Sequence, residues 1–156
     1  MTFLINALAF LLSFLLMEAV AWLTHKYVMH GLLWFLHDDH HYKDHFGFWE
    51  KNDFFFLIFA LPGILLMLLG SLHLFDVRFW MGTGIAVYGM AYFFVHDLFI
   101  HQRLPVLKQT NNIYLRAVRK AHKMHHKHLG KEDGECFGML WVPMKYFKEA
   151  KASKKS

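Results

Sequence analysis

Three long stretches with almost no charge restrict the folds open to this chain more than any other feature. They are residues 3–23, interrupted by Glu18, residues 54–75, with no charged side chain, and residues 79–100, where Asp97 alone is charged. About 20 apolar residues in a helix cross the hydrocarbon core of a bilayer. A soluble helical core is the alternative, but three such stretches in 156 residues favour three transmembrane helices.

The second stretch contains Pro62 and Gly63, which could kink the helix or divide it into a hairpin. The sequence therefore predicts an all-α integral membrane protein with about three transmembrane helices, or four if the hairpin forms. The length suits a single membrane-embedded domain over residues 1–156. Residues 150–156 read as a solvated basic tail.

The composition excludes several classes of protein. Hydrophobic residues make up 56% of the chain, which excludes a disordered chain. Cys136 is the only cysteine, which excludes a disulfide framework and a thiolate iron–sulfur site within one chain. The net charge of +5 could attract nucleic acid, but the Phe-rich apolar stretches fit a membrane better, so no nucleic-acid partner is expected.

The basic residues predict the orientation in the membrane. Of the 17 Lys and Arg residues, 16 fall in residues 26–51 and 103–156, and Arg78 is the remaining one. Positively charged loops stay in the cytoplasm, so both segments and the carboxy terminus are expected there, with the amino terminus outside.

The carboxy-terminal part predicts an amphipathic helix lying along the membrane. Asn111 or Asn112 is its expected N-cap, and Gly130 and Gly134 are expected to end it. One face of this helix is basic and could attract an acidic partner or lipid head groups. That face comprises Arg116, Arg119, Lys120, Lys123 and Lys127.

Ten of the 13 histidines repeat one pattern twice, an H-x4-H pair followed by an H-x2-H-H triple. In chain order they are His25 and His30, then His37, His40 and His41, then His96 and His101, then His122, His125 and His126. Each pair ends a predicted transmembrane stretch and each triple follows it, so histidine-bearing helices are expected in the cytoplasm. Neutral imidazole is a ligand for iron, copper, zinc and nickel, and ten ligands suit two ions. His45, His73 and His128 read instead as ordinary interfacial residues.

The spacings carry further expectations. Positions i, i+3 and i+4 of a helix lie within an arc of about 100°, so each triple could converge from one element. The members of an H-x4-H pair lie about 140° apart on an ideal helix, which suits a helix end, a π-bulge or ligands of two different metals. The sequence has no Glu-x-x-His motif, which disfavours a carboxylate-bridged di-iron site, and haem would leave the triples unexplained.

Several polar residues near the histidines are candidates for contacts with them. Asp38, Asp39 and Asp97 could accept imidazole N–H groups, although exposure to solvent explains Asp38 and Asp39 equally well. Glu18 could face the site or could be a hydrogen-bonded packing residue. The dipeptide 52–53, Asn52 and Asp53, reads first as the N-cap of the second span, with contact to the histidines as the alternative.

The segments HKYVMHG, HDDHH, GFWEKNDFFF, HDLFIHQRLP, HKMHH and GECFGMLWVP resemble those of the bacterial β-carotene hydroxylases, in the fatty-acid hydroxylase and desaturase superfamily. The resemblance implies a non-haem di-iron centre held by the ten histidines, with O2 as co-substrate and electrons from outside. It implies hydroxylation at carbon 3 of the β-ionone rings of β-carotene, through β-cryptoxanthin to zeaxanthin. The resemblance to bacterial members, together with the basic loops, leads us to expect a multi-pass protein of the bacterial inner membrane with its active site in the cytoplasm.

The substrate side is less defined by the sequence. A lipid-dissolved carotenoid should pass between the spans, where aromatic residues could line its path and glycines could make room for a ring or simply let helices pack. These residues are Phe54, Phe55, Phe56, Tyr88, Tyr92, Phe93, Phe94, Gly82, Gly84 and Gly89. No flavin, nicotinamide or iron–sulfur motif is present, so a ferredoxin with its reductase is the expected electron donor. The alternatives are a fatty acyl or sterol hydroxylase, a carotenoid ketolase, or a non-enzymatic membrane metal-binding protein.

Overall fold

The computed structural model describes residues 1–42, 48–104 and 108–153. Across these residues the chain forms helices and no strand. The elements are α1 (Thr2–Leu23), the π-helical η1 (Thr24–Leu32), α2 (Trp34–His41), the 3-10 turn η2 (Lys51–Asp53), α3 (Phe54–Ser71), α4 (Val77–Tyr92), the π-helical η3 (Phe93–Ile100), α5 (Ile113–His125) and α6 (Met144–Ala152).

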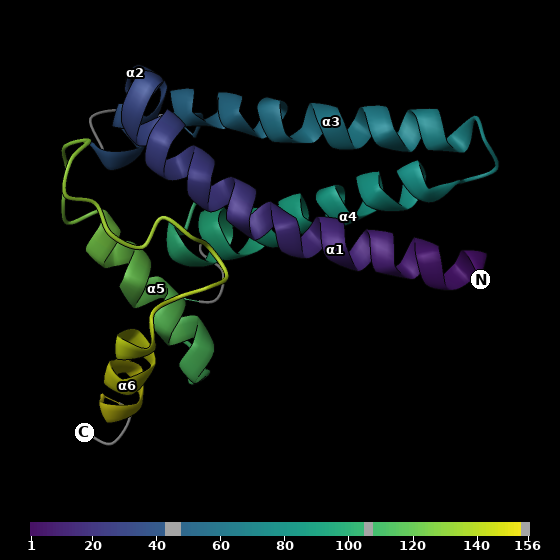
Figure 1. Cartoon of the computed structure of the whole chain (residues 1–156). Coiled ribbons are helices and arrows are strands. Elements are labelled where there is room, and N and C mark those ends of the chain that lie inside the picture. The colour runs from purple at the N-terminus through teal and green to yellow at the C-terminus, as the bar shows by residue number, and fades with distance from the viewer. Residues whose placement is uncertain (43–47, 105–107, 154–156) are drawn as a thin grey trace.

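Three continuous helical stretches are long and apolar enough to cross a membrane: Thr2–Leu32, Lys51–Ser71 and Val77–Ile100. Helices α3 and α4 form an antiparallel hairpin, and α1 packs against α4 (Figure 1). Large apolar side chains cover the outside of this bundle; Leu12, Leu61 and Phe94 are 56%, 61% and 62% exposed. Such a surface suits lipid. The predicted all-α integral membrane protein is confirmed.

The Pro62-Gly63 dipeptide does not divide the second span, because α3 runs through it without interruption. The four-helix variant therefore does not form. The span ends at Ser71, four residues before the predicted end. Leu74 and Phe75 adopt positive φ angles of 56° and 57°, which turn the chain toward α4.

Glycines set the distance between the spanning helices. A Cβ atom on Gly84 would lie 2.0 Å from Ser13 Oγ, and one on Gly82 would lie 2.5 Å from the carbonyl oxygen of Gly63. Both contacts are too short for any side chain, so these two glycines allow close packing and leave no room for a substrate ring. Gly89 differs, since a Cβ atom there would have no neighbour within 4 Å.

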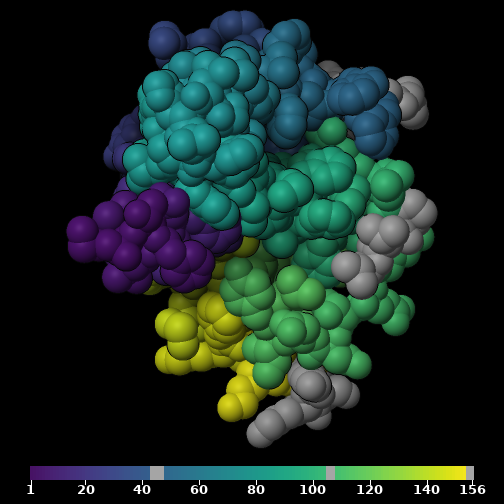
Figure 2. Space-filling model, turned by 90° about the vertical axis from the view of Figure 1, so that its right-hand side faces the viewer, coloured from purple at the N-terminus to yellow at the C-terminus, as the bar shows by residue number. Residues whose placement is uncertain are grey.

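Helices α5 and α6 lie together to one side of the bundle, as Figure 2 shows in green and yellow. Asn112 caps α5, as predicted, by accepting a hydrogen bond from the backbone N–H of Leu115 at 3.1 Å. The helix ends at His125, before the predicted glycines, because the chain then turns back across the histidines.

Helix α6 was not expected from the sequence. Its Tyr146 and Ala150 are each 2% exposed and pack in one core with Val118 and Ala121 of α5. Residues 150–152, predicted from the sequence to lie in a basic tail, belong to this helix, and residues 154–156 lie outside the described part.

Candidate metal centre

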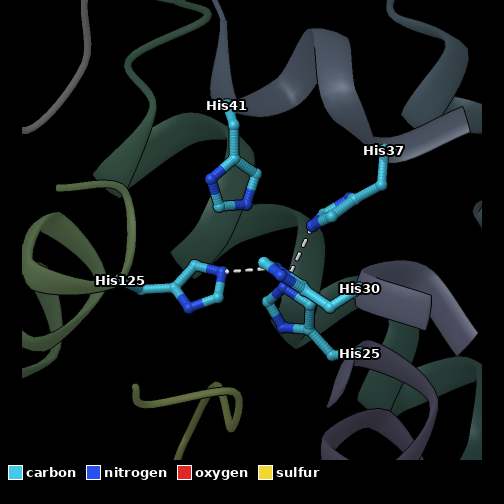
Figure 3. Close-up of side chains that lie close together, drawn as sticks. All are labelled: His25, His30, His37, His41 and His125. Atoms are coloured by element: carbon cyan, nitrogen blue, oxygen red, sulfur yellow. Dashed lines mark hydrogen bonds between the residues drawn. The ribbon is translucent and has the colours of Figure 1, made fainter. Parts of the chain in front are cut away.

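The ten patterned histidines gather at one end of the bundle in two adjacent groups. Site A consists of His25, His30, His37, His41 and His125, all buried, with one nitrogen of each within 4.8 Å of the others. Site B contains His40, His101, His122 and His126, and one nitrogen of each again lies within 4.8 Å of the others. His96 completes site B, because its Nε2 lies 3.2 Å from His40 Nε2. Figure 3 shows the rings of site A pointing toward one another from three elements.

Both H-x4-H pairs lie on π-helical backbone, as one of the predicted alternatives required. His25 and His30 belong to η1, and His96 belongs to η3 with His101 as its C-cap. The backbone N–H of His101 donates to the carbonyl of His96 at 2.9 Å, a bond that spans five residues. Such i→i+5 bonding brings residues five apart onto one side of the helix. Both members of each pair therefore serve the same site.

The triples behave differently from the expectation that each would converge as a unit. In each one the middle histidine joins the other site: His40 of the first triple lies in site B, and His125 of the second lies in site A. With 3.6 residues per turn, position i+3 projects about 60° to one side of position i and position i+4 about 40° to the other. The first and third histidines of a triple therefore point into one site, and the middle histidine points into the neighbouring site.

Backbone oxygens fix the orientation of four site A rings. The loop of residues 128–137 supplies four carbonyls that accept hydrogen bonds from imidazole Nδ1 atoms. The carbonyl oxygen of Phe137 accepts from His25 Nδ1 at 2.9 Å, and that of Lys131 accepts from His30 Nδ1 at 3.0 Å. The carbonyl oxygen of His128 accepts from His41 Nδ1 at 3.2 Å, and that of Glu135 accepts from His125 Nδ1 at 2.9 Å. A carbonyl cannot donate a proton, so each Nδ1 must carry the hydrogen. Each Nε2 of these rings therefore presents a lone pair to the centre.

Facing lone pairs at short range fit a cation. The Nε2 atoms of His25 and His37 are 3.1 Å apart, as are those of His30 and His125. Burial lowers the pKa of His37 to about 2, of His125 to about 3 and of His41 to about 4, so these rings are neutral at pH 7. Adjacent imidazole nitrogens bound at about 2.1 Å to one ion lie about 3.0 Å apart when the ion is octahedral. The donor set, all neutral imidazole, therefore fits a transition metal such as iron.

Carboxylates stand behind site B. Glu50 Oε2 lies 2.6 Å from His40 Nδ1, and Asp97 Oδ2 lies 3.5 Å from His96 Nδ1. The guanidinium of Arg103 joins the acidic group, at 3.0 Å from Glu50, 2.7 Å from Asp53 and 3.1 Å from Asp97. Burial raises the pKa of the Glu50 carboxyl, and the charge of Arg103 opposes that rise.

The turn of residues 50–53 contacts both sites. Asn52 Oδ1 accepts from His37 Nδ1 at 2.7 Å, so its side chain holds a site A histidine and does not cap α3. Asp53 accepts from the backbone N–H of Glu50 at 3.0 Å and closes a capping box with it. Asp97 Oδ2 lies 3.5 Å from His96 Nδ1, and neither Glu50 nor Arg103 was among the predicted residues. Both occur in segments that carried the family resemblance, and burial was the signal that the sequence did not provide.

Asp38 and Asp39 make contacts that the sequence did not predict. Asp38 Oδ1 lies 2.9 Å from Lys51 Nζ, and Asp39 Oδ2 accepts from the backbone N–H of Lys51. These contacts hold the 50–53 turn against α2.

Glu18 is the hydrogen-bonded packing residue of the two alternatives. One carboxylate oxygen accepts from the backbone N–H groups of Met139, Leu140 and Trp141, each at 2.9 Å. The other accepts from Tyr88 Oη at 2.7 Å. Glu18 thus ties the chain just after the 128–137 loop to the membrane bundle.

Of the other three histidines, His73 and His128 have side chains that belong to neither site A nor site B. His73 is exposed in the turn between α3 and α4, at the far end of the bundle from α2 (Figure 1). His128 contributes its backbone carbonyl to His41. His45 lies outside the described residues.

The aromatic residues proposed for a substrate path divide into two groups. Phe55 and Tyr92 contact the metal centre, with ring centroids 6.3 Å from His37 and 4.7 Å from His96, and Tyr88 binds Glu18. The other four are exposed on the outside of the bundle: Phe54, Phe56, Phe93 and Phe94.

Much of the basic face of α5 is used inside the chain. Arg119 donates to the carbonyl of Phe99 at 2.8 Å, Lys120 pairs with Glu149 at 2.6 Å, and Arg116 donates to Ser153 Oγ at 2.8 Å. Lys123 and Lys127 are exposed.

The chain is similar to a known family and to named relatives. Residues 10–146 match the model of the fatty acid hydroxylase family. The chain is 41% identical over 138 residues to a beta-carotene hydroxylase of Pantoea ananas, covering 88% of this chain and 78% of the relative. It is 35% identical over 130 residues to a beta-carotene hydroxylase of Paracoccus sp. (strain PC1), covering 83% and 79%.

A plant protein is also similar. Over 130 residues the chain is 42% identical to a chloroplastic beta-carotene hydroxylase 2 of Capsicum annuum, covering 81% of this chain and 41% of that protein. No solved structure matches the chain. The match to the family model covers most of the sequence and every histidine of sites A and B, and the chain belongs to the fatty acid hydroxylase family.

Proposed function

We propose that this chain is a di-iron carotenoid hydroxylase that acts at carbon 3 of the β-ionone rings of β-carotene, through β-cryptoxanthin to zeaxanthin. One observation carries the proposal: two groups of inward-facing imidazoles share one end of a three-helix membrane bundle. The names of the relatives supply the substrate class. A carotenoid is apolar and dissolves in lipid, which suits a centre next to membrane-spanning helices.

In this proposal, different residues hold the irons, orient the histidine rings and contact the substrate. Sites A and B would each hold one iron, and the bound irons would pass on electrons from an outside donor and offer open positions for O2, so that an unactivated C–H bond can be attacked. The carbonyls of the 128–137 loop and Asn52 orient the site A rings. Phe55 and Tyr92 present apolar ring surface beside the histidines, where an ionone ring could lie.

We also propose a membrane location and an electron donor for the chain. We place the chain in the bacterial inner membrane with the metal centre in the cytoplasm, because 16 of the 17 basic residues flank that end. Electrons would come from an acidic carrier such as a ferredoxin with its reductase. The exposed Lys123 and Lys127 are the members of the α5 basic face best placed to attract it.

Co-expression in bacteria that accumulate β-carotene tests the proposal. Chromatography of the pigments should show zeaxanthin with the wild-type chain. His40→Ala and His125→Ala each remove a nitrogen from the centre and should reduce conversion per unit of membrane-inserted protein to background. His73→Ala is the matched control and should leave conversion near wild type. Ketolated pigments would instead indicate a ketolase, and wild-type conversion by either site variant would contradict the di-iron centre.

A further inference from the structure

The two sites differ in the charge of the groups behind their histidines. In site A every Nδ1 atom has a neutral oxygen as partner, namely the four loop carbonyls and the amide of Asn52. A neutral acceptor fixes the ring but adds no net charge near the ion.

Site B has ionisable partners instead. Glu50 contacts His40 at 2.6 Å and Asp97 lies 3.5 Å from His96. Arg103 contacts both, and Asp53 as well, so one guanidinium faces three carboxylates. With all three carboxylates ionised, the group carries a net charge of −2, from three negative charges and one positive. Arg103 is 9% exposed in its side chain and Glu50 13%, so water screens this charge only in part.

A carboxylate that accepts the imidazole N–H makes the ring a stronger ligand, and negative charge nearby favours a cation further. Both effects act on site B. The contrast is sharpest within the 50–53 turn, where two side chains that each contact an imidazole Nδ1 differ in charge. Glu50 supports His40 of site B, and Asn52 supports His37 of site A.

We infer that sites A and B bind metal unequally, that site B is the tighter, and that Glu50 and Asn52 are the positioning residues that set the difference. This inference rests on the proposed metal-binding function. It assigns to the 50–53 turn a role in ranking the two sites, beyond holding their rings in place.

Titration of the purified, metal-free full chain in detergent with Co²⁺, followed by the absorbance of the bound ion, tests the inference. The wild type should bind two equivalents in two steps. His126→Ala should abolish the tighter step and His30→Ala the weaker one, since these residues belong to site B and site A respectively. Loss of the tighter step in His30→Ala, or two indistinguishable steps in the wild type, would overturn the inference.

Two substitutions exchange the charge between the sites. Glu50→Gln keeps an oxygen acceptor for His40 and should weaken the tighter step by about 10-fold to 100-fold, with the weaker step unchanged. Asn52→Asp places a carboxylate behind His37 and should tighten the weaker step. Glu50→Gln could disturb folding through the contact of Glu50 with Arg103. In that case the test rests on Asn52→Asp, and an unchanged affinity of the weaker step in this variant would refute the role of charge.

The same titration distinguishes failure of the proposed metal centre from failure of the inequality between the sites. A wild-type chain that elutes as a single folded species and takes up no Co²⁺ would refute the metal centre itself. Two bound equivalents of equal affinity would leave the metal centre intact and refute only the inequality. Neither result depends on hydroxylation activity.

Discussion

Glu18, a carboxylate in the first spanning stretch, holds the backbone next to the loop that orients histidines of site A. The carbonyls of Phe137 and Glu135 orient His25 and His125, and a shift of that loop would free both rings to rotate. Glu18 holds the backbone directly beyond the loop through Met139, Leu140 and Trp141. Its position within a transmembrane stretch is therefore explained by the three N–H groups that it satisfies.

Glu18→Ala should loosen this segment. Hydrogen bonds to a charged group contribute about 1.5–3 kcal/mol each, so losing three acceptor contacts should lower the thermal midpoint of the detergent-solubilised protein clearly. Tyr88→Phe removes one bond and leaves the loop contacts, so its midpoint should fall less. Glu18→Gln keeps an oxygen acceptor and should lie between wild type and alanine. Equal midpoints for Glu18→Ala and wild type would show that the loop is held by other contacts.

At the scale of elements, the sequence predicted those structures that depend on local pattern. The charge-free stretches predicted the spans, and the five-residue spacing of His25 and His30 predicted the π-helical alternative that η1 adopts. Helix α6 could not be predicted in this way, since its buried face exists only against α5.

Part of the metal centre was also beyond sequence reasoning. The exchange of His40 and His125 between the sites depends on how α2 and α5 lie relative to each other. The loop carbonyls leave no trace in the sequence at all, because every residue has one. That the ten histidines gather at one end of the bundle was predictable, because their repeat is local and their residue type is specific.

Close packing of α1 on α4 gives a test of the fold at this scale. Gly84→Ala would place a methyl group 2.0 Å from Ser13 Oγ and 2.5 Å from the carbonyl oxygen of Phe10, so the helices must separate. Overpacking of this kind costs about 1–3 kcal/mol. Gly89→Ala is the matched control on the same helix, since no atom lies within 4 Å of the new methyl group. The thermal midpoint should fall for Gly84→Ala and stay near wild type for Gly89→Ala; the reverse order would contradict the helix packing.

At the scale of the whole molecule, the candidate metal centre restricts how the chain can cross the membrane. Its histidines come from η1 and η3, which end the first and third spans, and from α2 and α5, which follow those spans, yet they meet at one end of the bundle (Figure 1). An odd number of crossings separates the amino terminus from α2, and an even number separates α2 from α5. The three spans thus place both triples on the same side, whereas a divided second span would place them on opposite sides.

Reporter fusions test this arrangement directly. A reporter after Ser156 should read cytoplasmic, because the basic segments flank the metal centre. A reporter inserted in the link of residues 72–76, between α3 and α4, should read external. Alkaline phosphatase and green fluorescent protein at each position give opposite signals, so each serves as the control for the other. An external carboxy terminus with an internal link would refute the orientation but keep the fold. The same side for both positions would refute the three-span fold itself, since α4 then could not cross the membrane between them.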